Sequence, residues 1–126
     1  MSLRSPLGRV LGRGAAGEGT SHWWQQRVTA IALIPLALWF ITGLLRRHAA
    51  MYVEIYDWLS RPWPALLATL LVLTLAWHSK LGVQVVIEDY VHGKGAKTAL
   101  LLLSAYLHAI AALACVLALL RLALNS

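Results

Sequence analysis

Three long apolar runs dominate the pattern of hydrophobic and polar positions along this chain. They cover residues 28–45, 65–86 and 98–120. A helix needs about 20 mostly apolar residues, within a range of roughly 17–25, to cross the hydrocarbon core of a membrane. Each run meets that requirement, the first one narrowly. The pattern therefore predicts an all-α integral membrane protein built as a bundle of three transmembrane helices.

The segment between the first two runs, residues 46–64, has a different pattern. Its aromatic and aliphatic residues are spaced amphipathically, with acids at Glu54 and Asp57. This predicts a short interfacial helix that ends in a turn over residues 61–64. Pro35, inside the first run, is expected to kink that helix or to be tolerated there. Four tryptophans lie where an aromatic belt would anchor the spans in the membrane interfaces: Trp23, Trp24, Trp58 and Trp63.

The chain begins with a polar lead that is rich in arginine and glycine. Residues 1–21 are expected to form a flexible tail, supported by the glycines of residues 8–19, and residues 22–126 the transmembrane domain. The arginine-rich, acid-poor lead also suits a mitochondrial transit peptide. We favour a bacterial tail and keep the mitochondrial alternative open.

The low content of charged residues supports a membrane protein, and the cysteine content adds no further constraint. The 126 residues are 60% hydrophobic and only 13% charged, with a net charge of +6, whereas about a quarter of the residues of a soluble domain are charged. The basic residues cluster at the ends of the apolar runs, so they indicate topology and not nucleic-acid binding. The single cysteine, Cys115, can form no internal disulfide.

The distribution of basic residues predicts the orientation. The side that carries the N-terminus has Arg4, Arg9, Arg13, Arg27, Lys94 and Lys97, and the opposite side has Arg46, Arg47, Arg61 and Arg121. By the positive-inside rule, the N-terminus is expected in the cytoplasm, or in the matrix of a mitochondrion.

Two histidines, His78 and His108, lie well inside apolar runs. Ionisable residues inside a span are costly and point to function, although a hydrogen bond between helices is the structural alternative. His78 shares a narrow helical stripe with Gly82, Val85 and Asp89. A glycine one turn away would leave room for a planar macrocycle bound through the imidazole. His78 is therefore a candidate haem ligand.

His108 lies among small residues, which let another helix approach closely: Ser104, Ala105, Ala111, Ala112 and Cys115. Its depth is similar to that of His78, so a haem held between these two histidines of one chain is geometrically feasible. Arg27, where the first run begins, is either an ordinary positive-inside residue or a partner for a haem propionate. Lys80 falls on the opposite side of its helix from His78 and is expected to extend to the interface.

Two stretches give the chain a resemblance to a known family. One is His78-x-x-x-Gly82 followed by Gln84 and Asp89-Tyr90, and the other is Arg27-Val28-Thr29-Ala30-Ile31-Ala32-Leu33. Over about residues 20–120 the chain resembles the hydrophobic membrane anchor subunit, the D-type subunit, of succinate dehydrogenase. The stretch Val-Val-Ile-Glu-Asp-Tyr-Val-His resembles the alphaproteobacterial and mitochondrial branch.

The resemblance implies a succinate:quinone oxidoreductase, respiratory complex II, in a bacterial inner membrane or the mitochondrial inner membrane. The implied partners are a flavoprotein, an iron–sulfur subunit and a second membrane anchor, the cytochrome b subunit, which shares one haem b with this chain. It implies that His78 is an axial ligand of the haem iron and that Arg27, and less closely His22, meet the haem propionates. Asp89 and Tyr90 match positions at the ubiquinone site.

Two alternatives stay open. The first is an independent bis-histidine cytochrome b, with His78 and His108 as ligands; the resemblance gives His108 no role. The second is a haem-free assembly or scaffold protein of a membrane complex. A flavin motif is absent and there is one cysteine, so this chain is not expected to oxidise succinate alone.

Overall fold

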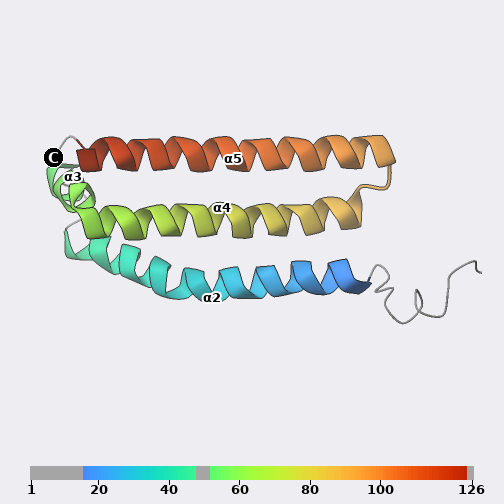
Figure 1. The fold of residues 1–126 in the computed structure, drawn as a ribbon, viewed down its shortest axis with the longest axis horizontal. Helices are drawn as coiled ribbons and strands as arrows, with labels where there is room; N and C mark the ends of the chain where they lie inside the picture. The colour runs from blue at the N-terminus through green and yellow to red at the C-terminus, as the bar shows by residue number, and fades with distance from the viewer. Residues whose placement is uncertain (1–15, 48–51, 125–126) are drawn as a thin grey trace, which may run out of the picture.

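The computed structural model describes residues 16–47 and 52–124, and these form helices joined by short connections. The helices are α2 (Ala16–Arg46), α3 (Tyr52–Ser60), α4 (Pro62–Tyr90) and α5 (Lys94–Leu124). Three of them, α2, α4 and α5, are long and apolar enough to cross a membrane. Figure 1 shows these three lying side by side. The prediction of an all-α protein with three spans is confirmed.

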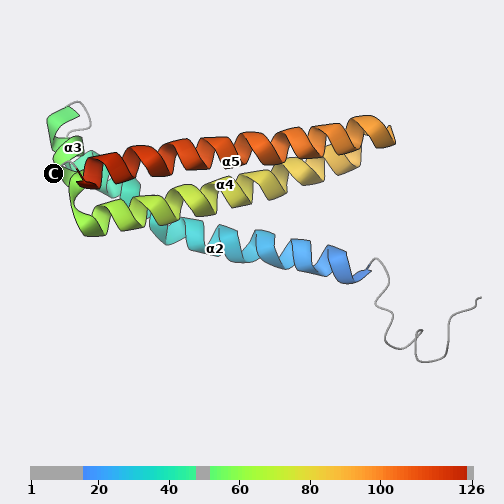
Figure 2. The ribbon, with the colours of Figure 1, turned by 45° about the horizontal axis from the view of Figure 1, so that its top comes forward.

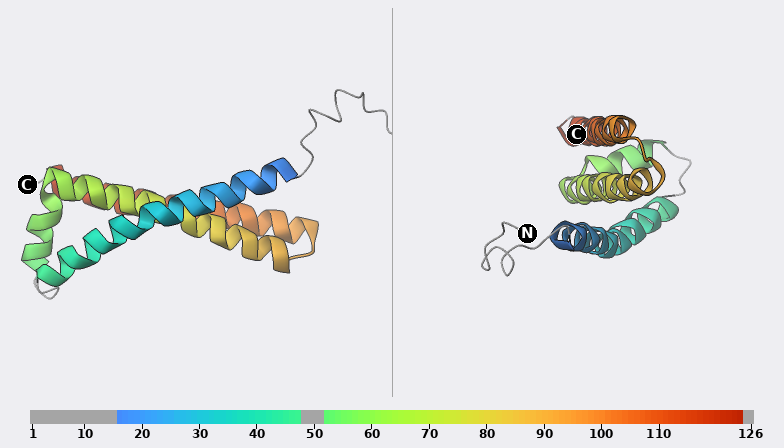
Figure 3. Two further views of the ribbon diagram at one scale, coloured as in Figure 1. Left: turned by 90° about the horizontal axis from the view of Figure 1, so that it is seen from below. Right: turned by 90° about the vertical axis from the view of Figure 1, so that its right-hand side faces the viewer.

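The three long helices form a row with α4 in the middle, packed against α2 on one side and α5 on the other (Figure 3, right). Successive helices run in opposite directions, so α2 begins at the end of the molecule where α4 stops (Figure 1). We call this the loop end, and the opposite one the α3 end. Towards the loop end α2 diverges from α4 (Figure 2), because it crosses α4 at an angle.

The row leaves most of the apolar surface uncovered. Within the most apolar 18-residue stretch of each long helix, at most 6% of the residues are buried. The described core consists of only a few side chains: Trp58, Ala65, Ala68, Leu81 and Leu119. Uncovered apolar faces of this extent mark contact with lipid or with other chains.

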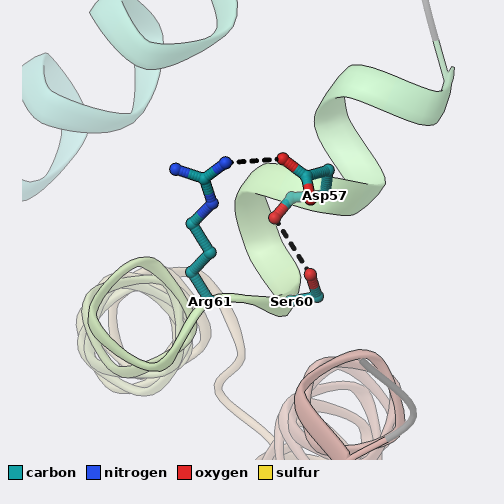
Figure 4. Close-up of polar contacts among 3 residues, drawn as sticks. All are labelled: Asp57, Ser60 and Arg61. Carbon is teal, nitrogen blue, oxygen red and sulfur yellow. Dashed lines mark hydrogen bonds and ion pairs between the residues drawn. The ribbon is translucent and has the colours of Figure 1, made fainter.

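The short helix predicted between the first two spans is present as α3. Arg61 Nη2 donates to Asp57 Oδ2 at 2.8 Å, and Ser60 Oγ donates to the Asp57 carbonyl at 2.9 Å, which closes the end of α3 (Figure 4). The turn predicted over residues 61–64 is wrong, because α4 already begins at Pro62. Proline suits the first position of a helix, since its missing N–H would have no partner there.

Trp58 does not serve as an exposed interfacial anchor, contrary to the prediction. It is only 5% exposed. Its ring packs against those of Trp39 and Phe40, with centroids 5.2 and 5.9 Å away, and the Arg47 guanidinium lies 4.4 Å from its centroid. Trp58 thereby fixes α3 against the end of α2.

Two further boundaries differ from the prediction because helical hydrogen bonding continues beyond the apolar runs. The first helix begins at Ala16, so the expected domain boundary after residue 21 falls inside α2; residues 1–15 lie outside the described part. The connection left between the second and third apolar runs, residues 87–97, is reduced to residues 91–93. There Lys97 Nζ donates to the carbonyl of Glu88 at 3.0 Å, which ties the start of α5 to the end of α4.

Candidate functional site between α2 and α4

Polar residues on α2 and α4 meet where these helices cross. On α2, His22, Gln26 and Thr29 are spaced by four and three residues, so they lie on one face of the helix. On α4, His78 and Gly82 are one turn apart. Contacts of His78 with Gln26 and Thr29 join the two faces. We call these five residues the α2–α4 cluster.

The His78 imidazole contacts α2 through both of its nitrogens. Its Nδ1 lies 2.8 Å from Thr29 Oγ1, and its Nε2 lies 3.5 Å from Gln26 Nε2. The side chain is half-buried. The imidazole is therefore held in one orientation inside the span, with Thr29 as its close partner.

Two polar atoms of the α2–α4 cluster are buried without a hydrogen-bond partner among the described residues. They are His22 Nε2 and Gln26 Oε1. Leaving a buried donor or acceptor unpaired costs about 1–3 kcal/mol. The α2–α4 cluster therefore retains polar groups that a further polar molecule or chain would satisfy.

Gly82 leaves room beside His78. Among the described residues, a Cβ added there would meet only Gln26 Nε2, at 3.8 Å, which is ordinary van der Waals contact. Packing within this chain therefore does not require a glycine. There is thus room for at least one methyl group on the same stripe as the imidazole.

The residues of the α2–α4 cluster fit a haem bound through His78. An imidazole is a common haem ligand, Gly82 has no side chain to obstruct a group beside His78, and His22 Nε2 has no hydrogen-bond partner among the described residues. The Gln26 amide faces His78 Nε2, so its side chain has to turn aside before that nitrogen can bind iron.

Arg27, the expected propionate partner, is not part of the α2–α4 cluster. It neighbours Gln26 in sequence, but its side chain is exposed and its guanidinium lies 5.2 Å from the centroid of the Trp23 ring. Arg27 lies in the same loop-end half of α2 as His22, Gln26 and Thr29.

Asp89 and Tyr90 form the last turn of α4 at the loop end, separate from the α2–α4 cluster. Both are exposed, Tyr90 by 79%. They lie 11 and 12 residues beyond His78 on a continuous helix, or about 16 and 18 Å along its axis. The structure thus gives a phenol and a carboxyl side by side in sequence, open to solvent or to a partner.

His108 contacts a different helix from His78. Its Nδ1 lies 2.7 Å from the backbone carbonyl of Ser104, and its Nε2 lies 3.1 Å from Ser79 Oγ on α4. A carbonyl only accepts hydrogen bonds, so Nδ1 carries the proton and Nε2 accepts from the Ser79 hydroxyl. His108 is therefore a hydrogen-bonded link between α5 and α4, which was the structural alternative for it.

A small-residue surface surrounds His108, as predicted. Ala105, Ala109 and Ala112 line a hollow of about 280 Å³ between α4 and α5. Lys80 lines the same hollow and is half-buried, with Nζ 4.8 Å from the centroid of the Trp77 ring. Lys80 therefore stays beside Trp77 within the helix pair.

Comparison with known proteins assigns the chain to a protein family. The profile of the family described as succinate dehydrogenase/fumarate reductase transmembrane subunit matches residues 1–120. The chain belongs to this family. No solved structure was found to match it.

The similar curated proteins are succinate dehydrogenase membrane anchors, mostly alphaproteobacterial. The hydrophobic membrane anchor subunit of Rickettsia bellii is 34% identical over 90 residues, which is 71% of each chain. That of Paracoccus denitrificans is 33% identical over 101 residues, covering 80% of this chain and 78% of the relative. The membrane anchor subunit of Reclinomonas americana is 32% identical over 85 residues, or 61% of this chain and 67% of that one.

Membership of the succinate dehydrogenase anchor family makes this chain a multi-pass membrane subunit, part of an enzyme complex. A haem held by His78 and His108 of one chain gains no support, because the two imidazoles contact different helices.

Three residues of these contacts, Gln26, Thr29 and Ser79, were missed as candidates in the sequence. The signal for the first two was their spacing from His22 on one helical face. Ser79 gave no signal beyond its position next to His78.

Proposed function

We propose that this succinate dehydrogenase anchor provides His78 as one axial ligand of a haem b, and that Asp89 and Tyr90 border the site where ubiquinone is reduced. The second haem ligand comes from the other membrane anchor, the cytochrome b subunit. The iron–sulfur subunit and the flavoprotein complete the complex and deliver the electrons of succinate.

One observation supports the haem assignment above the others. His78 is an imidazole fixed inside a span, with Gly82 one turn away and unpaired buried polar atoms across from it on α2. When bound, the haem would supply one-electron transfer, and His78 would be the ligand that this chain contributes. Arg27 and His22 would hold the propionates by charge-assisted hydrogen bonds.

The position of Asp89 and Tyr90 supports the quinone assignment. They lie at the exposed end of α4, where protons can enter from solvent. Reducing a quinone to a quinol takes two electrons and two protons. The Tyr90 hydroxyl can donate a hydrogen bond to a quinone carbonyl, and the Asp89 carboxyl can relay a proton.

This assignment requires the loop end to face the iron–sulfur subunit. The basic residues predict that the loop end lies on the cytoplasmic side of a bacterial inner membrane, or on the matrix side in a mitochondrion. Electrons and protons for the quinone would then arrive from the same side.

The assembled complex carrying His78→Ala tests the haem assignment. Loss of one axial imidazole is expected to change the low-spin optical and electron paramagnetic resonance spectra, even where the partner's ligand retains the ring. The matched control is His108→Ala, which removes the other histidine inside a span and is expected to leave the spectra unaltered. An unchanged spectrum in His78→Ala would falsify the assignment.

A further inference from the structure

We infer that Thr29 is a positioning residue for the haem ligand. Its hydroxyl accepts a hydrogen bond from His78 Nδ1–H and so leaves Nε2 as the nitrogen that binds iron. The inference rests on the proposed function of His78 and adds a role that neither the sequence pattern nor the family description assigns to Thr29.

Thr29 has a single hydroxyl proton, which it donates within its own helix. Thr29 Oγ1 lies 2.8 Å from the Gln25 carbonyl and 3.1 Å from the Gln26 carbonyl of its own helix. Carbonyl oxygens only accept, so the proton is donated to α2, as is common for a threonine inside a helix. Towards His78 the Thr29 oxygen can then only accept.

The contact with Thr29 determines the tautomer of His78. Because Thr29 Oγ1 accepts at 2.8 Å, His78 Nδ1 carries the proton. In a neutral imidazole the other nitrogen then has a free lone pair. The Gln26 contact agrees, since its Nε2 amide group faces His78 Nε2 at 3.5 Å as a donor.

The tautomer of His78 set by Thr29 is the one that iron binding through Nε2 needs. A histidine that binds a metal through Nε2 keeps its proton on Nδ1 and needs an acceptor there, which fixes the ring and strengthens it as a ligand. Thr29 Oγ1 is the acceptor at that position. The α2 backbone therefore orients His78 on α4 before any haem arrives, through the hydroxyl of Thr29.

The consequence is electronic as well as geometric. Donating the Nδ1–H bond makes the imidazole a stronger electron donor and stabilises the oxidised haem relative to the reduced one. Without the acceptor, the reduction potential of the haem should move to a more positive value. A residue that only fills space at this position would not produce that shift.

The test uses the assembled complex with Thr29→Val, which keeps the shape of the side chain and removes the hydroxyl. Pulsed electron paramagnetic resonance reads the coupling of the remote nitrogen of each axial imidazole. One of the two remote nitrogens is expected to change, the potential to rise, and haem affinity to fall about 10- to 100-fold, as for other outer-shell partners.

Two matched variants separate the hydroxyl from the rest of the side chain. Thr29→Ser keeps the hydroxyl and is expected to retain the coupling and potential of the unaltered protein. Thr42→Val removes a hydroxyl that bonds to α2 carbonyls in the same way, at 2.7 and 3.0 Å, but makes no hydrogen bond to a histidine among the described residues. It is expected to change neither quantity.

The outcomes with these variants decide whether Thr29 positions His78. If Thr29→Val leaves the coupling and the potential unchanged, or if Thr29→Ser alters them equally, Thr29 has no positioning role. If Thr29→Val prevents assembly, Thr29→Ala compared with Thr29→Ser examines the same hydroxyl. A spectrum that changes in His78→Ala but not in the Thr29 variants refutes this inference alone, whereas one that His78→Ala leaves unchanged refutes the ligand itself.

Discussion

Trp58 on α3 fills the space that a side chain at Gly43 on α2 would need. A Cβ built at Gly43 would overlap the Trp58 ring. The same ring is covered by Trp39, Phe40 and the Arg47 guanidinium. The glycine therefore permits the contact that fixes α3 to the end of the first span.

Gly43→Ala is expected to destabilise the protein, because the added methyl group must displace Trp58. Forcing extra carbon into a packed contact costs about 1–3 kcal/mol. The measurement is the melting temperature of the purified complex in detergent. Gly95→Ala is the control: a Cβ there meets no described atom within 4 Å, and alanine favours a helix by about 1 kcal/mol over glycine. Equal melting temperatures for the two variants would contradict the packing described for Trp58.

The bond between His108 and Ser79 predicts a coupled effect on stability. Hydrogen bonds between membrane helices contribute about 0.6 kcal/mol on average, so His108→Ala and Ser79→Ala should each weaken the packing of α5 on α4 slightly. Because they remove the same bond, the double variant should cost less than the sum of the single ones. Unfolding in mixed detergent micelles measures all three. Strictly additive costs would show that the two side chains do not interact.

Spans could be predicted from the sequence more reliably than helix ends. Apolar runs report where lipid surrounds a helix, and hydrogen bonding does not stop there. Hence α4 extends from Pro62 to Tyr90, beyond the run of residues 65–86, and takes Asp89 and Tyr90 out of the expected loop. Trp58 illustrates a second limit. A tryptophan near the end of a span suits a membrane interface and a packed contact equally well, and only the position of α3 decides between them.

Of the candidate site, only the proposed haem ligand, His78, could be predicted from the sequence. A histidine inside a span stands out by its cost, so His78 was found. Thr29 and Gln26 acquire a role only through the register of α2 against α4, which hydropathy does not encode. His108 has the same signal as His78 in sequence but bonds to Ser79 instead. One sequence could not distinguish them, because the helix that each faces is a property of the packing.

The topology has a direct test in labelling of intact cells. With Cys115 replaced by alanine, Ser126→Cys is expected to react with an impermeant thiol reagent from outside, because the basic residues put the loop end inside. Gly95→Cys, at the loop end, is the matched position and should react only after lysis. The opposite pattern would reverse the orientation and put Asp89 and Tyr90 on the wrong surface for the proposed quinone site.

The quinone site has its most specific test in Tyr90→Phe, which keeps the ring and deletes only the hydroxyl. Tyr90 is 79% exposed and its hydroxyl makes no hydrogen bond within the part of the chain that the structure describes, so assembly and the haem spectrum should survive the change. Electron transfer from succinate to an artificial dye that accepts electrons before the quinone should survive as well. Quinone reduction, in contrast, should fall.

The size of that fall follows from the bond that Tyr90→Phe removes. A hydrogen bond to a developing quinol, worth about 1–3 kcal/mol, corresponds to a rate lower by roughly five- to hundredfold. Tyr106→Phe is the control, because Tyr106 is an exposed tyrosine on α5 and is 67% exposed; it should leave both assays unchanged. Equal loss of dye and quinone reduction in Tyr90→Phe would indicate damaged assembly. Normal rates in both would make Tyr90 an interfacial anchor, because a phenol that donates to the quinone cannot be removed without slowing its reduction.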